Sequence, residues 1–181
     1  FLSNIREMQA LAHVVRCFED QNITHVDGSV DPVRDAEIIN LELIFADLES
    51  VLKRLMKTEK LLKTSDQQNK KDHEILNRIK SELESGKFIS LESFDDEEKA
   101  FVKSLHLLTI KPMFYIANVS DDSRSKELLN SLEDFARNLN HDVVPTFIKI
   151  EQEIALLEDE ERSEYLELME MDEPVLNKVI F

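Results

Sequence analysis

Glycine, cysteine and tryptophan are all scarce in this sequence. Its 181 residues include two glycines, Gly28 and Gly86, one cysteine and no tryptophan. Loops that cradle phosphate groups need several glycines, because backbone N–H groups must approach the oxygen anions closely. Neither G-x-x-x-x-G-K-[ST] nor G-x-G-x-x-G occurs in the sequence. These residues therefore supply no glycine-rich phosphate loop.

Positive charge and long apolar runs are also lacking. The formal net charge is −16, which opposes binding to free nucleic acid or a membrane surface, because both are polyanions. The single cysteine, Cys17, allows no internal disulfide, so nothing suggests secretion. No signal peptide or bilayer-length apolar run is present. We expect a cytoplasmic, soluble protein with no membrane partner and no direct binding to free nucleic acid.

The length and the first residue bound the organisation of the chain. A chain of 181 residues has room for one domain, or for one domain with an insertion. Hydrophobic residues make up 42% and charged residues 33%, which is enough for a core and a solvated surface. Phe1 is not an initiator methionine, so we expect the chain to begin inside a longer polypeptide.

Three short apolar runs predict a parallel sheet covered by helices. They are LAHVVRCF at 11–18, KPMFYIANV at 111–119 and DVVPTFIKI at 142–150. Runs that are apolar on both faces are typical of parallel strands. A helical pattern at 124–140 joins the second run to the third, which is a parallel crossover unit. Helical patterns are also predicted at 1–10 and in the acidic tail, where Pro174 interrupts them.

The sequence between the first two runs predicts a helical hairpin. A coiled-coil seam is formed by Leu41, Ile44, Leu48, Val51, Leu55 and Leu62, interrupted at Thr58. A polar tip follows, and the seam returns in a second helix through Ile75, Leu76, Ile79 and Leu83. Gly86 is its predicted C-cap. A further short helix begins after Ser93 or Asp95. The coarse picture is an α/β fold with an inserted antiparallel hairpin.

Asn118 is the candidate binding residue that follows from this layout. It ends the second apolar run, and ligands of open parallel sheets lie beyond the carboxyl ends of the strands. Its carboxamide offers a donor and an acceptor, which suits the edge of a purine. Asp121 can accept hydrogen bonds from a base or cap the next helix. The alternative is that Asn118-Val119-Ser120-Asp121 is ordinary turn and capping chemistry.

Long blocks of the sequence resemble one known family. The blocks are FLSNIRE, AHVVRCFED, NITHV, DPVRDAEIINLELIFADLE, KPMFYIANVS and DEERSEYLELMEMDEPVLNKVI. They are similar to the Obg-like ATPase (YchF) family of P-loop NTPases nearly from end to end. The resemblance implies a partial Ras-like nucleotide-binding domain with an inserted coiled-coil hairpin. We expect the nucleotide-binding domain at 1–40 and 109–181 and the insertion at 41–108.

The resemblance assigns roles to specific residues. It places Asn118, Val119, Ser120 and Asp121 in the base-specificity motif, where the family has Asn-x-x-Glu and prefers ATP. Asp121 is one methylene shorter than that Glu and closer to the residue of Ras-like GTPases. A second base-contacting turn, usually of small residues, corresponds to Phe147, Ile148 and Lys149. These bulkier groups narrow the space expected for a purine.

His25 matches the proposed catalytic histidine of the family. An imidazole there can orient water or stabilise charge on the transferring phosphoryl group. The alternative is an exposed loop histidine without a role. In the first apolar run, His13, Arg16 and Cys17 are expected to be structural.

Several parts that the family implies are absent from this sequence. They are the phosphate-binding loop, the Thr and Asp-x-x-Gly segments that bind Mg²⁺, and the C-terminal TGS domain. The resemblance implies ATP or GTP with Mg²⁺, and association with ribosomes or translation factors. Three hypotheses stay open: the base-recognition half of an ATPase, a non-enzymatic interaction module, and a truncated remnant. We expect no ATP turnover from these residues alone. Because a sheet edge and an apolar face are left uncovered, we also expect the isolated chain to self-associate or to behave as a loosely packed protein.

Overall fold

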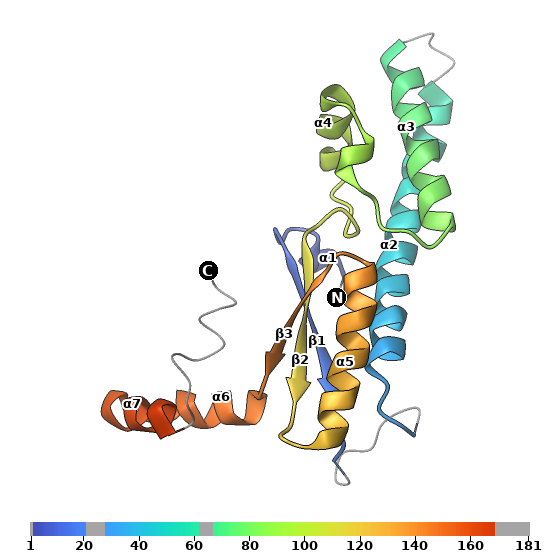
Figure 1. Cartoon of the computed structure of the whole chain (residues 1–181). Helices are drawn as coiled ribbons and strands as arrows, with labels where there is room; N and C mark the ends of the chain where they lie inside the picture. The colour runs from blue at the N-terminus through green and yellow to red at the C-terminus, as the bar shows by residue number, and fades with distance from the viewer. Residues whose placement is uncertain (1, 21–27, 62–66, 169–181) are drawn as a thin grey trace. The chain divides into compact units, whose positions relative to one another are not determined.

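In the computed structural model, the described residues are 2–20, 28–61 and 67–168 (Figure 1). They divide into two compact units. The helical unit consists of Phe1–Leu11 and Glu37–Pro112, and the sheet unit of Ala12–Ala36 and Met113–Phe181. Each unit is described by itself.

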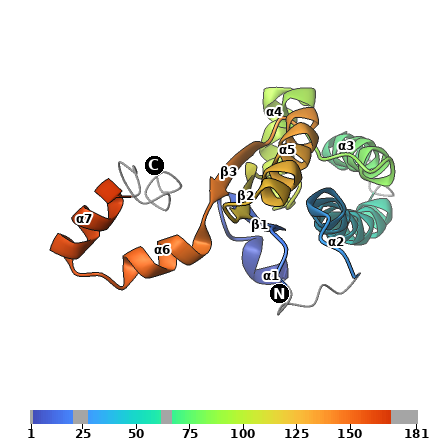
Figure 2. The ribbon, with the colours of Figure 1, turned by 60° about the horizontal axis from the view of Figure 1, so that its bottom comes forward.

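The helical unit is built around two long antiparallel helices. Helix α2 spans Pro32–Leu61 and enters the unit at Glu37, and α3 spans Gln67–Glu84. Figures 1 and 2 show the two helices lying side by side. The remaining elements of the unit are α1 at Leu2–Ile5, the short 3-10 turn η2 at Leu91–Ser93 and α4 at Asp96–Ser104. The predicted insertion of an antiparallel hairpin is therefore present.

The seam between α2 and α3 follows the predicted spacing with one error. Ile44, Val51 and Leu55 are buried on α2, and all four predicted positions of α3 are buried. Thr58 fills the interrupted slot, because it is only 5% exposed and its hydroxyl donates to the Arg54 carbonyl at 3.0 Å. Leu41 was predicted in the seam, but it is 45% exposed, so that prediction is wrong. Leu62 lies outside the described residues.

Two predicted helix ends are confirmed in the helical unit. Gly86 has a φ of 75°, a conformation that costs glycine little. Its N–H donates to the Leu83 carbonyl at 2.9 Å, and the Lys87 N–H donates to the Glu82 carbonyl at 3.1 Å, which is a Schellman ending. Of the two candidate caps for α4, Asp95 is the one used. Its carboxylate accepts from the Glu98 N–H at 2.8 Å within a capping box.

A buried carboxylate joins distant segments of the helical unit. Asp47 on α2 is fully buried and accepts hydrogen bonds from the Leu108 N–H at 3.0 Å and the Thr109 N–H at 2.8 Å. The Thr109 hydroxyl donates to it at 2.8 Å. Arg6 completes the set with an ion pair at 2.8 Å. Burying a carboxylate requires such partners, since desolvation of an unpaired charge is costly.

The sheet has the strand order β1-β2-β3, with β1 at Leu11–Cys17, β2 at Met113–Val119 and β3 at Asp142–Thr146. β2 and β3 are parallel, and Figure 1 shows all three arrows pointing the same way. Helix α5 at Ser123–Asn138 connects β2 to β3 and packs on the sheet. The predicted parallel crossover is confirmed.

One face of the sheet carries the core of the sheet unit. On β2, Met113, Tyr115, Ala117 and Val119 are buried, whereas the alternate residues are half-buried. Tyr115 is fully buried, and the rings of His13, His141 and Phe135 lie 5.6, 5.8 and 6.3 Å from its ring centre. Leu128, Leu132 and Ala136 on α5 complete this core.

The third strand is shorter than its apolar run. It was expected to extend to Ile150, but β3 ends at Thr146 and α6 begins at Ile148 and ends at Ala155. Because Ile150 and Ile154 also fit a helical spacing, the apolar run alone did not distinguish the two structures. Burial of Ile154, which is 2% exposed, supports the helix. Helix α7 follows at Asp159–Leu168, and Pro174 lies outside the described residues.

The remaining predictions concern the first residues and membranes. The helical pattern at 1–10 forms only the short helix α1. Among the described residues, no helix combines the length and the apolar character needed to cross a bilayer.

Candidate functional site

Asn118 lies at the carboxyl edge of the sheet. It is the penultimate residue of β2, and the parallel register pairs it with Thr146, the last residue of β3. Since side chains alternate along a strand, Asn118 lies on the opposite face from the buried Ala117 and Val119. Its side chain is half-buried. The predicted end-of-strand position of this carboxamide is therefore present.

The loop after Asn118 is held by a buried serine on α5. Ser125 is 1% exposed, and its hydroxyl accepts a hydrogen bond from the Ser120 N–H at 2.9 Å. The same hydroxyl donates to the Cys17 carbonyl at 2.6 Å. One side chain thus joins the carboxyl ends of β1 and β2 to the first turn of α5. No motif in the sequence predicted this role for Ser125, although a serine three positions after a capping acid was the available signal.

The helix cap of α5 is Asp122 rather than Asp121. The Asp122 carboxylate accepts from the Ser125 N–H at 2.8 Å and from the Ser120 hydroxyl. The hydrogen bond from Ser120, followed by that from the Ser125 N–H, lowers the pKa of Asp122 below its ordinary value. Asp121 was predicted to accept from a base or to cap this helix. It does not cap, and its exposed carboxylate lies 3.3 Å from the Lys126 ammonium.

The second predicted base-contacting segment, residues 147–149, begins directly after the last residue of β3. Phe147 is the N-cap of α6 and makes no side-chain capping hydrogen bond. It is half-buried, whereas Ile148 is 36% exposed and Lys149 is exposed. Because Thr146 pairs with Asn118, this segment and the Asn118 loop follow neighbouring strands at the same sheet edge. The two expected base-contacting segments are thus brought to one edge.

The other sequence candidates have packing roles or lie outside the described residues. His25 is among residues 21–27, which are not described. Burial lowers the pKa of His13, which packs on Tyr115. The Arg16 guanidinium donates to the Phe18 carbonyl at 3.0 Å and lies over the Phe18 ring. Cys17 is fully buried, and burial raises its pKa to about 12, so it is not a nucleophile at neutral pH.

A metal ion has no candidate ligand set in this part of the structure. Among the described residues, no group of three or more His, Cys, Asp or Glu side chains is placed to hold one. Octahedral Mg²⁺ sites use carboxylates together with substrate phosphates. The described residues therefore offer no such group of carboxylates for Mg²⁺.

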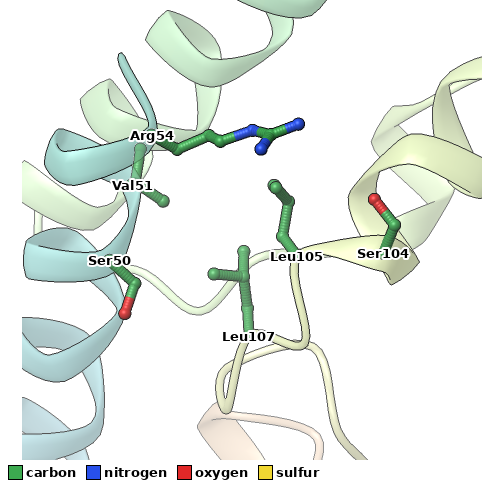
Figure 3. A pocket seen from close by; sticks show the side chains of 6 residues that line it. All are labelled: Ser50, Val51, Arg54, Ser104, Leu105 and Leu107. Carbon is green, nitrogen blue, oxygen red and sulfur yellow. The ribbon is translucent and has the colours of Figure 1, made fainter. Parts of the chain in front are cut away.

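The helical unit contains a separate hollow of about 230 Å³. Figure 3 shows the six side chains that line it, Ser50, Val51, Arg54, Ser104, Leu105 and Leu107. Both hydroxyls are already used within their own helices, because Ser50 donates to the Ala46 carbonyl and Ser104 to the Phe101 carbonyl. The hollow thus lacks an acid–base pair or a nucleophile, and it offers no reaction chemistry.

No family model matches this chain, but individual proteins match it over 99% of its length. The chain is 45% identical over 184 residues to the ribosome-binding ATPase YchF of Bacillus subtilis and 40% identical over 181 residues to that of Escherichia coli O157:H7. Each match covers 99% of this chain and 50% of the relative. The chain therefore spans about half the length of the curated relatives it matches.

A solved structure gives the same result for the fold. The structure of the Schizosaccharomyces pombe YchF GTPase matches with a TM-score of 0.82 and 28% identity. That match covers 99% of this chain and 50% of the yeast chain. The arrangement of parallel strands and inserted hairpin is thus that of part of a Ras-like P-loop domain.

Proposed function

Because the chain belongs to the YchF family, we propose that it carries the base-recognition half of a nucleotide-binding ATPase that associates with the ribosome. The bacterial relatives are named ribosome-binding ATPases, and the yeast structure is named a GTPase. The proposal extends these properties to the protein to which these residues belong. A cytoplasmic location follows from association with the ribosome.

The position of Asn118 is the observation that carries the proposal. An open parallel sheet binds ligands beyond the carboxyl ends of its strands, and Asn118 is half-buried at that edge. Its carboxamide donates and accepts hydrogen bonds, which matches the donor and acceptor on one edge of adenine. The Ser125 and Asp122 hydrogen bonds support the proposal, because they fix the loop on which the carboxamide depends.

The roles proposed for the neighbouring residues differ. Val119 is buried in the core and supports the strand. Ser120 positions the loop through its bond to Asp122. Asp121 contacts a base only after its carboxylate separates from Lys126. We assign to Phe147, Ile148 and Lys149 the second wall of the base site, where their size selects how the purine fits.

Hydrolysis requires groups that these residues do not supply. Positioning of the phosphates and Mg²⁺ provides most of the catalysis of phosphoryl transfer. The sequence has no glycine-rich phosphate loop, and the described residues contain no metal-ligand group. We therefore assign phosphate and Mg²⁺ binding to residues outside this chain. His25 remains the proposed catalytic histidine and acts only together with them.

Base recognition is tested by nucleotide titration of the 181-residue chain followed by NMR. Adenosine, ATP and GTP are added separately, and we expect weak, saturable shifts of the backbone amides at 118–121 and 147–149. Asn118→Ala weakens binding about 5- to 150-fold, because a bidentate Asn–base contact contributes about 1–3 kcal/mol. Asn130→Ala, an exposed asparagine on α5, is the matched control and leaves binding unchanged.

The result also separates the alternative functions. Shifts that are equal in Asn118→Ala and the parent chain would show that the carboxamide does not read a base. An absence of any binding would favour the interaction module or the truncated remnant. Preference for ATP over GTP is tested by the same titrations with Asp121→Glu, which restores the longer side chain of the family motif. Mg²⁺-dependent ATP turnover by the isolated chain would contradict the assignment of the phosphate site to other residues.

A further inference from the structure

A line of exposed apolar side chains runs along α2, away from the seam with α3. Its members are Ile38, Leu41, Phe45, Leu52 and Met56, which are 51, 45, 63, 39 and 57% exposed. At 3.6 residues per turn these positions fall on one narrow face of the helix. We call this face the α2 stripe. It lies entirely within the helical unit, and contiguous exposed apolar surface of this kind marks interaction sites.

The spacing of the α2 stripe is symmetric along the helix. Leu41, Phe45, Leu52 and Met56 are separated by intervals of four, seven and four residues. A two-fold axis between positions 48 and 49 therefore places Phe45 of one copy opposite Leu52 of an antiparallel second copy, and Leu41 opposite Met56. Such self-complementarity is what an isologous interface requires.

The charges beside the α2 stripe change sign along the helix in the same way. The exposed charged residues of the first half are acidic, namely Glu37 and Glu42. Those of the second half are mainly basic, namely Lys53, Arg54, Lys57 and Lys60, with Glu49 and Glu59 among them. An antiparallel pair brings each acidic half against a basic half, with Glu42 nearest to Lys53. Glu49 lies near the axis, but its charge is compensated by Lys53 of the same helix at 2.6 Å.

We propose that the α2 stripe is a self-association surface on which a second copy of this chain packs in antiparallel orientation. A parallel arrangement places acidic residues against acidic ones, which the charge pattern opposes. A uniformly basic or uniformly acidic partner helix matches only one half of α2. The proposal concerns the helical unit and does not depend on nucleotide binding by the sheet unit.

The expected dimer is weak. Covering the five side chains on both copies removes on the order of 900 Å² of apolar surface, given about 150–200 Å² for a fully exposed large side chain. This area lies below the range of stable, specific interfaces, which begins near 1,200 Å². The net charge of −16 on each copy also opposes association. We therefore expect a dimer that forms only at high protein concentration.

Sedimentation velocity measured over concentration tests the surface. From roughly 1 to 500 µM, the parent chain shifts from monomer to dimer by mass action. Combined substitution of Phe45→Glu and Leu52→Glu weakens association at least about tenfold, since it places unpaired carboxylates in the interface. Leu156→Glu is the matched control, because Leu156 is 80% exposed in the sheet unit. It leaves the dimer unchanged, and circular dichroism checks that each variant keeps its helix content.

Disulfide formation tests the orientation. Cys17 is buried with a raised pKa, so it does not compete with introduced thiols. A mixture of F45C and L52C chains should cross-link about tenfold faster than either chain alone, because like positions lie about 10 Å apart along the axis of an antiparallel pair. Equal rates for the mixture and the single variants would overturn the antiparallel arrangement. A chain that stays monomeric, or a dimer unaffected by the stripe substitutions, would overturn the surface itself.

Discussion

Ser125 is the residue on which the geometry of the candidate base site depends most directly. Its hydroxyl is both an acceptor for the Ser120 N–H and a donor to the Cys17 carbonyl. The Ser125 side chain is only 1% exposed, so its hydroxyl is shielded from solvent. The loop that follows Asn118 is thus fixed by one buried hydroxyl.

We expect Ser125→Ala to destabilise the chain by about 1–3 kcal/mol, because it leaves the partly buried Ser120 N–H and the buried Cys17 carbonyl without their partner. The measurement is urea unfolding followed by circular dichroism. Ser131→Ala is the matched control, since Ser131 is an exposed serine of the same helix whose hydroxyl donates to the Glu127 carbonyl. Equal stability of the two variants would show that the Ser125 bonds contribute little.

For single residues, the sequence predicts the type of side chain that acts at a place better than it predicts which position supplies that side chain. Asn118 was expected at the end of a strand and lies there. The cap of α5 was expected at Asp121 as one option and is Asp122. Two adjacent acids in a polar turn have equal capping chemistry, so only the backbone conformation decides between them. Ser125 was missed because its two partners come from segments that are remote in sequence.

Among the structural elements, α2 takes part in three separate features of the helical unit. Its buried face forms the seam, its exposed face forms the α2 stripe, and Asp47 joins it to residues 108 and 109. Spacings of three and four residues predicted the seam at Ile44, Val51 and Leu55. The same rule placed Leu41 there wrongly, because two neighbouring apolar stripes on one helix share this periodicity.

We expect Asp47→Ala to destabilise the chain by about 3–5 kcal/mol, since it removes the carboxylate that pairs with Arg6 and leaves two buried N–H groups without their acceptor. Thermal unfolding by circular dichroism measures the loss. Glu49→Ala serves as a control, because Glu49 is an exposed acid on the same helix. A Tm for Asp47→Ala equal to that of the control would refute a stabilising role for this ion pair and its hydrogen bonds.

For the molecule as a whole, two partly buried histidines predict how stability varies with pH. Burial lowers the pKa of His13 and of His141, and this effect outweighs the opposing influence of Asp35 on His13 and of Asp142 on His141. The unfolded chain therefore binds more protons than the folded chain just below the ordinary histidine pKa of about 6.5. The contribution of the two neutral imidazoles to the free energy of unfolding is therefore fully present above that pH, and it is lost as the pH falls below it.

We expect the Tm to fall between pH 7.5 and about pH 5.5, and combined substitution of His13→Gln and His141→Gln to reduce that slope. Scans at several pH values supply the measurement. If the double variant has the slope of the parent chain, the two imidazoles do not govern the acid sensitivity.

The overall architecture was predictable from the sequence to a large degree. The parallel crossover and the antiparallel hairpin follow from apolar periodicity and from Gly86, and the comparisons confirm the family. The end of β3 was not predictable, because Ile150 and Ile154 suit a strand and a helix equally. The α2 stripe was also not anticipated, since exposure depends on which neighbours pack against a helix.

The placement of the two tyrosines makes the intrinsic fluorescence of the chain a signal from one unit only. Tyr115 and Tyr165 both belong to the sheet unit, and the chain contains no tryptophan. Ultraviolet emission excited near 280 nm therefore originates from that unit alone, and it changes when the enclosed phenol of Tyr115 meets solvent. Far-ultraviolet ellipticity instead reports the helices of both units. A titration in which the two signals change at different denaturant concentrations would therefore show, without any added dye, that the units do not melt together.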